Sequence, residues 1–249
     1  MTRALPITGL HNAWDLGGLP LDDDDRDTVR GRVYRSPRLD ALDDEGWDAL
    51  LEAGVRTIVD LRNDDEVSSL GVPAGITVHR APIEDQGDVE FMARYGEHLN
   101  SPRYYPEVLR RWPDLVIGAL RPVAEAPADG AVLIHCAGGR DRTGLIAAML
   151  LQLAGVMRAG IVNDYWLAVI AANFHLRENP RPHDPWRSNR ELGPWLDQVT
   201  GELHLFLDAF DAETWLRAHG AADLIEPLRA RLRDAWHPDA GIEFSSRSA

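Results

Sequence analysis

The chain has 249 residues, a formal net charge of −14, 45% hydrophobic residues and one cysteine, and this length suits one α/β domain with additions or two small domains. So acidic a chain argues against nucleic acid and anionic membranes as partners, and the lack of a run of about 18 apolar residues argues against a membrane span. A single cysteine excludes an intramolecular disulfide and a cysteine-based zinc site.

Three short runs rich in β-forming residues predict strands. They occupy 55–61 (VRTIVDL), 76–83 (ITVHRAPI) and 131–135 (AVLIH). The last run is apolar throughout, which is typical of a buried parallel strand. The alternation of strands and helical patterns predicts an α/β fold with a central, mostly parallel sheet flanked by helices. Helical patterns lie at 43–53, about 88–99, 104–126 with a break at Pro113, 142–155 and 159–178.

The C-terminal part of the chain carries only helical patterns from about residue 190 onward. The segment 178–186 (ENPRPHDPW) is rich in proline and predicts a loop before them. We therefore expect one domain over residues 1–249 with a helical C-terminal region. Its predicted parts are an α/β core at about 10–180, a helical part at about 190–236 and a flexible tail at 238–249.

The segment 135–144 (HCAGGRDRTG) contains the only cysteine and lies where the strand at 131–135 ends and a helix begins. In open α/β sheets, ligands bind at this carboxyl end of the strands. Two glycines in the turn allow successive backbone N–H groups to point inward, which forms an anion-binding nest at the positive end of the following helix. The residues expected to bind phosphate there are Ala137, Gly138, Gly139, Arg140, Asp141 and Arg142.

Cys136 and Arg142 are separated by five residues. At that spacing the Arg142 guanidinium can curl back over the nest and grip two phosphate oxygens. A cysteine at a helix N-terminus beside arginine has its thiolate stabilised, and the thiolate is the nucleophilic form. The pattern therefore predicts in-line attack of Cys136 on a phosphate monoester, with a phosphocysteine intermediate whose charge is held by N–H groups and Arg142.

Neighbouring residues are expected to support this chemistry. The Thr143 hydroxyl is placed to donate to the sulfur and to ease its departure when water attacks. His135 is interpreted as a buried imidazole that holds the loop in shape rather than as a general base. Asp60 and Arg62 end the neighbouring strand, so we expect them at the pocket rim, where Arg62 makes a second phosphate contact or an ion pair with Glu66.

These residues resemble the signature loop of the cysteine-dependent protein tyrosine phosphatase superfamily. More narrowly, HCAGGRDRTG is similar to the HC-x-x-G-K-D-R-T-G loop of bacterial tyrosine and dual-specificity phosphatases, a triple-specificity-like group with a Lys-Asp-Arg loop. The resemblance implies a tyrosine-phosphatase-like fold and activity. The chain departs from the group at Arg140, where a planar guanidinium replaces the usual lysine, so the wider substrate range stays open. Supporting segments within about 10–235 are NAWDLGG (12–18), VYRSPRL (33–39), DLR (60–62) and IVNDY (161–165).

A general acid is needed near the leaving oxygen of the ester. Asp141 lies within the signature loop, where the resembling group carries aspartate. Asp85 lies in the loop after the second predicted strand, where the superfamily places its movable acid. Asp88 and Asp114 are further alternatives. Asp114 belongs to a Trp-Pro-Asp string, but it precedes the cysteine by only 22 residues, and a helix and a strand must fit between them.

The sequence thus predicts a metal-independent phosphomonoester hydrolase without a cofactor, which acts on phosphotyrosine protein or with dual specificity. No metal-ligand spacing such as H-E-x-x-H occurs. A phosphoinositide or inositol phosphate phosphatase, a rhodanese-like sulfurtransferase and a phosphate-binding protein without activity remain alternatives. Because the one thiol suits a reducing compartment and the N-terminus lacks an apolar signal core, we expect a cytoplasmic protein, and export by an unconventional route stays open.

Overall fold

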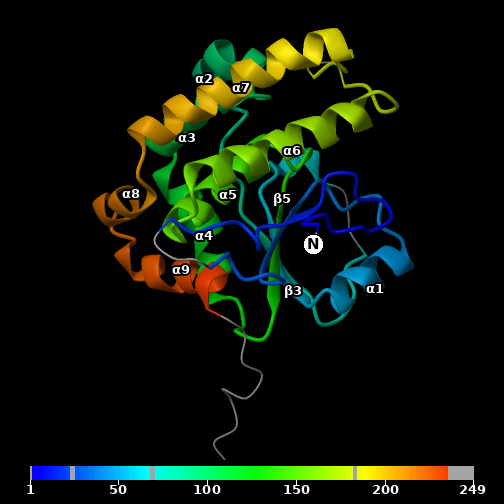
Figure 1. Ribbon diagram of the computed structural model, residues 1–249, viewed down its shortest axis with the longest axis vertical. Coiled ribbons are helices and arrows are strands. Elements are labelled where there is room, and N and C mark those ends of the chain that lie inside the picture. The colour runs from blue at the N-terminus through cyan, green and yellow to red at the C-terminus, as the bar shows by residue number, and fades with distance from the viewer. Residues whose placement is uncertain (1, 23–25, 68–70, 182–183, 235–249) are drawn as a thin grey trace, which may run out of the picture.

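The computed structural model describes residues 2–22, 26–67, 71–181 and 184–234 (Figure 1). The tail predicted at 238–249 therefore lies outside the described residues. Within these ranges, no helix has both the length and the apolar character needed to cross a membrane.

A five-stranded sheet lies at the centre of the described part of the chain (Figure 1). Its strands run in the order β1 (Trp14–Asp15), β2 (Val33–Ser36), β5 (Ala131–His135), β3 (Val55–Asp60) and β4 (Thr77–Arg80). β1 pairs antiparallel with β2 and the other neighbours are parallel, so the predicted mostly parallel sheet is confirmed. The three predicted strands are all present as β3, β4 and β5.

The sequence pattern does not predict β1 and β2. β1 has only two residues, and β2 (VYRS) ends in two polar residues although it is buried along its whole length. The Arg35 side chain can lie inside the protein because Asp164 and two backbone carbonyls accept from its guanidinium. A buried charge that is paired and hydrogen-bonded in this way avoids most of the cost of leaving water.

Helices surround the sheet at the predicted positions. Asp43 caps α1 by accepting from Gly46 N, and Asp88 caps α2 by accepting from Phe91 N. Pro113 begins α4 directly after α3, which confirms the predicted break, since proline needs no N–H partner at a first helical position. The α-helices are α1 (Asp44–Glu52), α2 (Val89–Tyr95), α3 (Tyr105–Arg111), α4 (Pro113–Glu125), α5 (Asp141–Leu153), α6 (Arg158–Leu176), α7 (Asn189–Ala209), α8 (Ala212–Ala218) and α9 (Ile225–Arg233). Short 3₁₀ helices are η1 (Asp64–Glu66), η2 (Gly96–His98), η3 (Pro102–Tyr104) and η4 (Ala222–Leu224).

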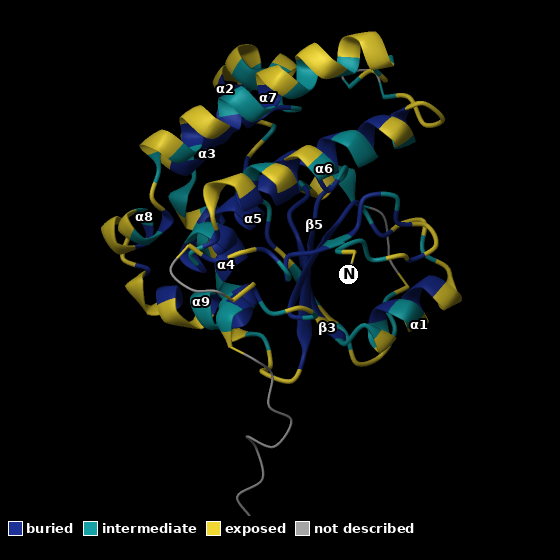
Figure 2. Ribbon diagram, viewed as in Figure 1, coloured by how far each residue is buried: buried dark blue, intermediate teal, exposed yellow. Residues whose placement is uncertain are grey.

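The sheet separates two hydrophobic cores. Along β5, Val132 and Ile134 point into one core and Leu133 points into the other, because side chains alternate along a strand. The larger core lies under α2 to α9, whereas α1 and the N-terminal segment cover the opposite face (Figure 1). α5 is buried along nearly its whole length (Figure 2). Its N-terminus therefore lies at the carboxyl end of the central strand β5, beside the signature loop.

We expect the C-terminal helices to unfold together with the sheet, because their apolar side chains belong to the same core. Leu228 of α9 is fully buried in the core that also contains Val132. Leu228→Ala should lower the free energy of unfolding by about 2–5 kcal/mol, with one transition in urea denaturation followed by circular dichroism. Leu205→Ala is the matched control, since Leu205 is 70% exposed and its change should stay within about 0.5 kcal/mol. Two separate transitions would contradict the single-domain prediction.

Candidate active site

The loop at 136–140 joins the carboxyl end of β5 to the N-terminus of α5. Cys136 begins this loop and is 3% exposed. At Gly139 the backbone has a φ of +64°, and a Cβ atom there would lie 2.5 Å from the carbonyl carbon of Ser36. Glycine is the residue that tolerates both this φ and so close an approach. It allows the loop to pass directly over the end of β2.

Side chains from distant segments hold the carbonyl groups of this loop from outside. Asn12 Nδ2 donates to Gly138 O at 3.0 Å. Arg35 Nη2 donates to Gly139 O at 2.7 Å and to Arg140 O at 3.1 Å. The middle of the loop is therefore fastened both to the N-terminal segment and to β2.

The two ends of the loop are fastened in the same way. Tyr105 OH donates to Asp141 O at 2.8 Å, and Arg181 Nη2 donates to Ala137 O at 3.3 Å. For the N–H groups of residues 137–140, no acceptor is found within the described ranges of the chain. With its carbonyls engaged outside, the loop forms a bowl of amide donors at the positive end of α5. Such a bowl is suited to an anion.

Arg35 is itself held by an ion pair with Asp164 of α6, and the other carboxylate oxygen of Asp164 accepts from Arg3. These side chains are 0%, 2% and 9% exposed for Arg35, Asp164 and Arg3. Removal of one member would leave an uncompensated charge inside the protein. The series of charges thus connects the N-terminal segment and α6 to the carbonyl side of the loop.

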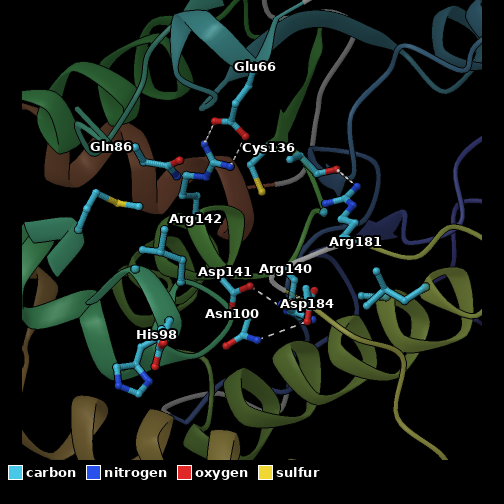
Figure 3. Close-up of a pocket in the computed structure, with 18 of the residues that line it drawn as sticks. Glu66, Gln86, His98, Asn100, Cys136, Arg140, Asp141, Arg142, Arg181 and Asp184 are labelled. Atoms are coloured by element: carbon cyan, nitrogen blue, oxygen red, sulfur yellow. Dashed lines mark hydrogen bonds and ion pairs between the residues drawn. The ribbon is translucent and has the colours of Figure 1, made fainter. Parts of the chain in front are cut away.

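Arg142 and Cys136 line the same cavity, and Figure 3 shows their side chains beside one another. Glu66 of η1 accepts from both terminal nitrogens of Arg142, with 2.7 Å between Nη2 and Oε1. Glu84 Oε1 lies 3.5 Å from Arg142 Nε. Burial alone would lower the pKa of Arg142, but Glu66, Glu84 and Cys136 raise it well above its usual value. A permanent cation therefore lies beside the thiol.

Asp141 also lines the cavity, and its carboxylate is held on both sides. Tyr165 OH donates to Oδ1 at 2.7 Å, and Arg140 Nε donates to Oδ2 at 2.8 Å. Burial raises the pKa of Asp141, and this effect exceeds the lowering caused by Arg140 and Tyr165. The carboxyl group therefore keeps its proton to a higher pH than a free aspartate does, as a general acid must.

The Arg140 guanidinium lines the cavity and is engaged by two carboxylates, so a phosphate contact through this side chain stays a prediction. Its Nε donates to Asp141, and its Nη2 donates to Asp184 at 2.9 Å. Asp184 also accepts from Asn100 and Arg187, each at 3.4 Å. The buried carboxylate of Asp141 and the half-buried carboxylate of Asp184 together hold the guanidinium at the cavity wall. The backbone N–H of Arg140 remains part of the bowl.

Asp60 and Arg62 do not lie at the pocket rim, and this prediction is wrong. The two side chains are buried, with 1% and 0% exposed, and neither lines the cavity. Arg62 Nη2 pairs with Asp60 Oδ2 at 2.8 Å, and its Nη1 pairs with Asp40 at 3.1 Å. These two carboxylates neutralise the guanidinium inside the protein. The carboxylate of Glu66 binds Arg142 instead.

His135 is fully buried at the end of β5. Its Nδ1 lies 3.3 Å from Cys136 O, and its Nε2 lies 3.7 Å from Asp60 Oδ1. Burial lowers the pKa of His135 to about 4, so the imidazole is neutral at neutral pH. The His135 ring is neutral and does not line the cavity. Both properties are consistent with the predicted role of holding the loop in shape.

The other acid candidates lie outside the cavity. Asp85 is exposed, and its carboxylate accepts from the backbone of its own turn. Asp88 caps α2 and pairs with Arg111 at 2.6 Å, and Asp114 lies in the first turn of α4. Of the four aspartates considered, Asp141 is the one that lines the cavity.

Thr143 is fully buried at the start of α5. Its hydroxyl finds no hydrogen-bond partner, the Cys136 sulfur included, in the part of the chain that the structure describes. The role assigned to Thr143 during departure of the sulfur therefore stays a prediction.

Sequence reasoning did not single out Glu84, Gln86 and Arg181. Glu84 directly precedes Asp85 and is 1% exposed. Gln86 lines the cavity, and its Nε2 donates to Glu84 Oε1 at 2.7 Å. For Glu84 and Gln86, the position after β4 was the available signal, but which of several adjacent polar side chains turns inward depends on tertiary packing. Arg181 lies in the proline-rich loop after α6 and also lines the cavity.

The cavity above the bowl has a volume of about 740 Å³, so it can hold more than a phosphate group. Its walls come from α2, η2, the C-terminal end of α6 and the loop after α6, and they include the apolar side chains of Met92, Leu99 and Leu176. His11 and His175 also line it and stack with 3.4 Å between ring centroids. Among the described residues, no group of three or more His, Cys, Asp or Glu side chains is arranged to hold a metal ion.

The chain that carries this site is similar to known phosphatases. A family model described as the tyrosine phosphatase family matches residues 5–233. The chain is 33% identical over 165 residues to the triple specificity protein phosphatase PtpB of Mycobacterium tuberculosis, which covers 54% of this chain and 60% of that protein. It is also 33% identical over 166 residues to a tyrosine-protein phosphatase of Nostoc commune, which covers 60% of this chain and 51% of that protein. The chain thus spans less than two thirds of the length of these relatives.

Asn12→Asp should weaken anion binding without removing the buried packing around residue 12. The variant keeps an oxygen to accept from Trp14 Nε1, as Asn12 Oδ1 does at 2.7 Å, but it loses the donor to Gly138 O and places a carboxylate against that carbonyl. We expect the Kd for inorganic phosphate, measured by calorimetry, to rise by about 10-fold or more. Asn189→Asp on the exposed start of α7 is the matched control. Unchanged phosphate affinity in Asn12→Asp would show that the carbonyl clamp does not shape the bowl.

Proposed function

Because the chain belongs to the tyrosine phosphatase family, we propose that it hydrolyses phosphomonoesters through a phosphocysteine intermediate and without a metal ion. The observation that carries this proposal is the shared cavity of Cys136 and Arg142 above a loop whose carbonyls at residues 138–141 are held by Asn12, Arg35 and Tyr105. A thiolate, a permanent cation and converging amide donors are the groups that phosphoryl transfer to sulfur requires.

In the first half-reaction, the Cys136 thiolate attacks the phosphorus atom and the P–O bond to the leaving group breaks. The N–H groups of residues 137–140 and the Arg142 guanidinium stabilise the equatorial oxygens. Glu66 engages two of the five N–H donors of Arg142, so the remaining donors can bind phosphate while the side chain keeps its orientation.

Asp141 is the proposed general acid for the leaving oxygen. It lines the cavity, its pKa is raised by burial, and Tyr165 and Arg140 fix its carboxyl group from two sides. An acid held in one orientation delivers its proton in a defined direction. Asp85 is the weaker choice because its side chain is exposed and does not line the cavity.

In the second half-reaction, a water oxygen attacks the phosphorus atom and the S–P bond breaks. The electron pair of that bond returns to sulfur as the thiolate. The Asp141 carboxylate takes a proton from the water, which restores the acid form. Thr143 remains the proposed donor that eases departure of the sulfur, since its buried hydroxyl lies at the start of α5 close to Cys136 in the sequence.

Phosphotyrosine in proteins is the proposed substrate, with dual specificity toward phosphoserine and phosphothreonine as the wider form. The proposal is supported by the tyrosine and triple specificity phosphatases among the relatives and by the volume and apolar wall residues of the cavity, which suit an aromatic ester group. A phosphoinositide substrate is a second form of the same chemistry. A reducing cytoplasm is the proposed location because it preserves the thiol.

Cys136→Ser should abolish turnover of p-nitrophenyl phosphate and retain binding of a phosphotyrosine peptide. Serine preserves the bowl but does not supply a thiolate. The measurements are p-nitrophenolate release with EDTA present and peptide affinity by calorimetry. The wild-type protein in EDTA is the control and should keep full activity. Activity that survives in Cys136→Ser but is lost in EDTA would overturn the thiol mechanism.

Asp141→Asn should remove the alkaline limb of the pH–rate profile for substrates with poor leaving groups. Asp141 must carry its proton to act as an acid, so the wild-type rate falls as pH rises through its raised pKa. Asparagine has no such proton, and the rate should drop by about 100-fold or more and become flat in this range. For substrates with good leaving groups, the rate of hydrolysis by the variant should fall only a little.

Asp85→Asn is the matched substitution for this experiment. Its pH–rate profiles for substrates with poor and with good leaving groups should both stay close to those of the wild type. The decisive comparison is the rate profile of phenyl phosphate for the two variants. An alkaline limb lost in Asp85→Asn and preserved in Asp141→Asn would transfer the role of general acid to Asp85.

A further inference from the structure

The guanidinium of Arg140 is shared by two carboxylates at the cavity wall (Figure 3). Its Nε donates to Asp141 Oδ2 at 2.8 Å, and its Nη2 donates to Asp184 Oδ2 at 2.9 Å. Asp184 lies in the loop after α6, 44 positions from Arg140 in the sequence. Asp141 is the proposed general acid, whereas the chemistry described so far gives Asp184 no role.

This sharing restricts the contact between Arg140 and Asp141 to one hydrogen bond. Nε and Nη2 form one edge of the planar guanidinium, and this edge can grip both oxygens of a carboxylate in a bidentate ion pair. Because Nη2 is bound to Asp184, the edge does not close on Asp141. The other oxygen of Asp141, Oδ1, accepts from Tyr165 OH at 2.7 Å instead.

A bidentate ion pair would interfere with the task of Asp141. A general acid gives up a proton and regains it in each turnover, and a full ion pair with arginine favours the ionised form of a carboxyl group. With one contact to each oxygen, Asp141 keeps further acceptor positions on both oxygens, where the proton can be carried. Burial raises the pKa of Asp141 most strongly, and the negative charge of Asp184 acts in the same direction.

The Asp184 carboxylate is held in place by contacts that do not involve Asp141. Its Oδ1 accepts from Asn100 Nδ2 and from Arg187 Nη1, each at 3.4 Å. The backbone of Arg187 is in turn fixed to α6, because Asn173 donates to Arg187 O at 2.9 Å and accepts from Arg187 N at 2.8 Å. The carboxylate therefore lies beside Arg140 as a fixed part of the cavity wall.

Other titratable groups also lie around Asp141. They are Glu84, Tyr104, Tyr105, Cys136, Arg142 and Tyr165. Burial raises the pKa of the three tyrosines well above the usual value, so these side chains are neutral at neutral pH. Burial raises the pKa of Glu84 as well, and Cys136 and Arg142 belong to the proposed phosphate site. Asp184 is thus a charged neighbour that can be substituted without a change to the bowl itself.

We propose that Asp184 is a positioning residue for the reaction: it holds one end of the Arg140 guanidinium and thereby leaves Asp141 free to donate and regain its proton. This inference rests on the proposed role of Asp141 as the general acid. Asp184 acts through Arg140 and forms no bond to substrate. Without the charge of Asp184, Nη2 is released and the guanidinium closes on both oxygens of Asp141.

Asp184→Asn tests the proposal in the pH–rate profile of phenyl phosphate, whose leaving group is poor. Asparagine is similar in size but uncharged, so Arg140 should turn to Asp141 and lower its pKa. Since Asp141 must carry its proton to act as the acid, the alkaline limb of kcat should move to lower pH by roughly one unit. Above that limb kcat should be about 10-fold below the wild type. The plateau at low pH and the rate with p-nitrophenyl phosphate should stay close to those of the wild type.

Two further variants separate the charge of Asp184 from its packing. Asp184→Glu keeps the charge and should return the alkaline limb to near its wild-type position. Asp197→Asn removes the same charge from an exposed position on α7 and is the matched control. If kcat of Asp184→Asn fell by one factor at every pH and with both substrates, the residue would serve only the packing of the loop and the positioning role would be overturned. An alkaline limb that keeps its wild-type position would overturn it as well.

The double variant Asp141→Asn/Asp184→Asn separates failure of this inference from failure of the proposed function. If Asp184 acts through Asp141, the double variant should have the flat profile and the rate of Asp141→Asn alone. A further loss of rate in the double variant would refute the role of Asp184, while Asp141 would remain the general acid. An alkaline limb that persists in Asp141→Asn would instead refute the proposed acid, and the inference about Asp184 with it.

Discussion

The site depends on one constraint, namely that the carbonyl groups of the loop at 136–141 are held away from its concave side. Asn12, Arg35 and Tyr105 donate to these carbonyls from three different parts of the chain. Once the carbonyls are engaged outside, planar peptide geometry turns the N–H groups of 137–140 to the inside. A loop without these donors would present carbonyl oxygens and amide hydrogens alike to an incoming dianion, and its attraction for phosphate would largely cancel.

The same constraint explains why so many charges are buried beside the sheet. Arg35 reaches the loop from inside the protein only because Asp164 compensates it, and Asp164 in turn is compensated by Arg3. Buried ion pairs of this kind add little to stability compared with apolar packing, but removal of one partner is strongly destabilising. Their arrangement is therefore better understood as fixing the position of the loop. In a chain with a net charge of −14, it also places positive charge beside the proposed phosphate-binding loop.

The sequence was sufficient to predict the α/β class, the strands β3, β4 and β5, and the combination of Cys136 and Arg142, because each depends on local pattern or fixed spacing. The segments NAWDLGG, VYRSPRL and IVNDY could be recognised only as supporting matches. In the structure they supply Asn12, Arg35 and Asp164, which converge on the loop from distant positions, and such convergence is a tertiary property without a local signal. The misplacement of Asp60 and Arg62 has the same origin, since the end of a strand can turn toward the pocket or into the protein. Which aspartate lies in the cavity wall could not be chosen from the sequence for the same reason, so Asp141 and Asp85 both remained candidates for the general acid.

The two glutamates around Arg142 show how the protein prepares the site before a substrate arrives. Arg142 is paired with Glu66, whose pKa is lowered by that contact in spite of burial, so the pair is ionic at neutral pH. Glu84, behind the guanidinium, has a raised pKa because burial outweighs the effect of Arg142. One carboxylate therefore keeps its charge and aligns the guanidinium, while the other keeps its proton to a higher pH than a free glutamate does. If both were fully charged, they would cancel much of the attraction that Arg142 exerts on phosphate. The different burial of the two glutamates thus allows Arg142 to be held in place and still act as a cation toward the substrate.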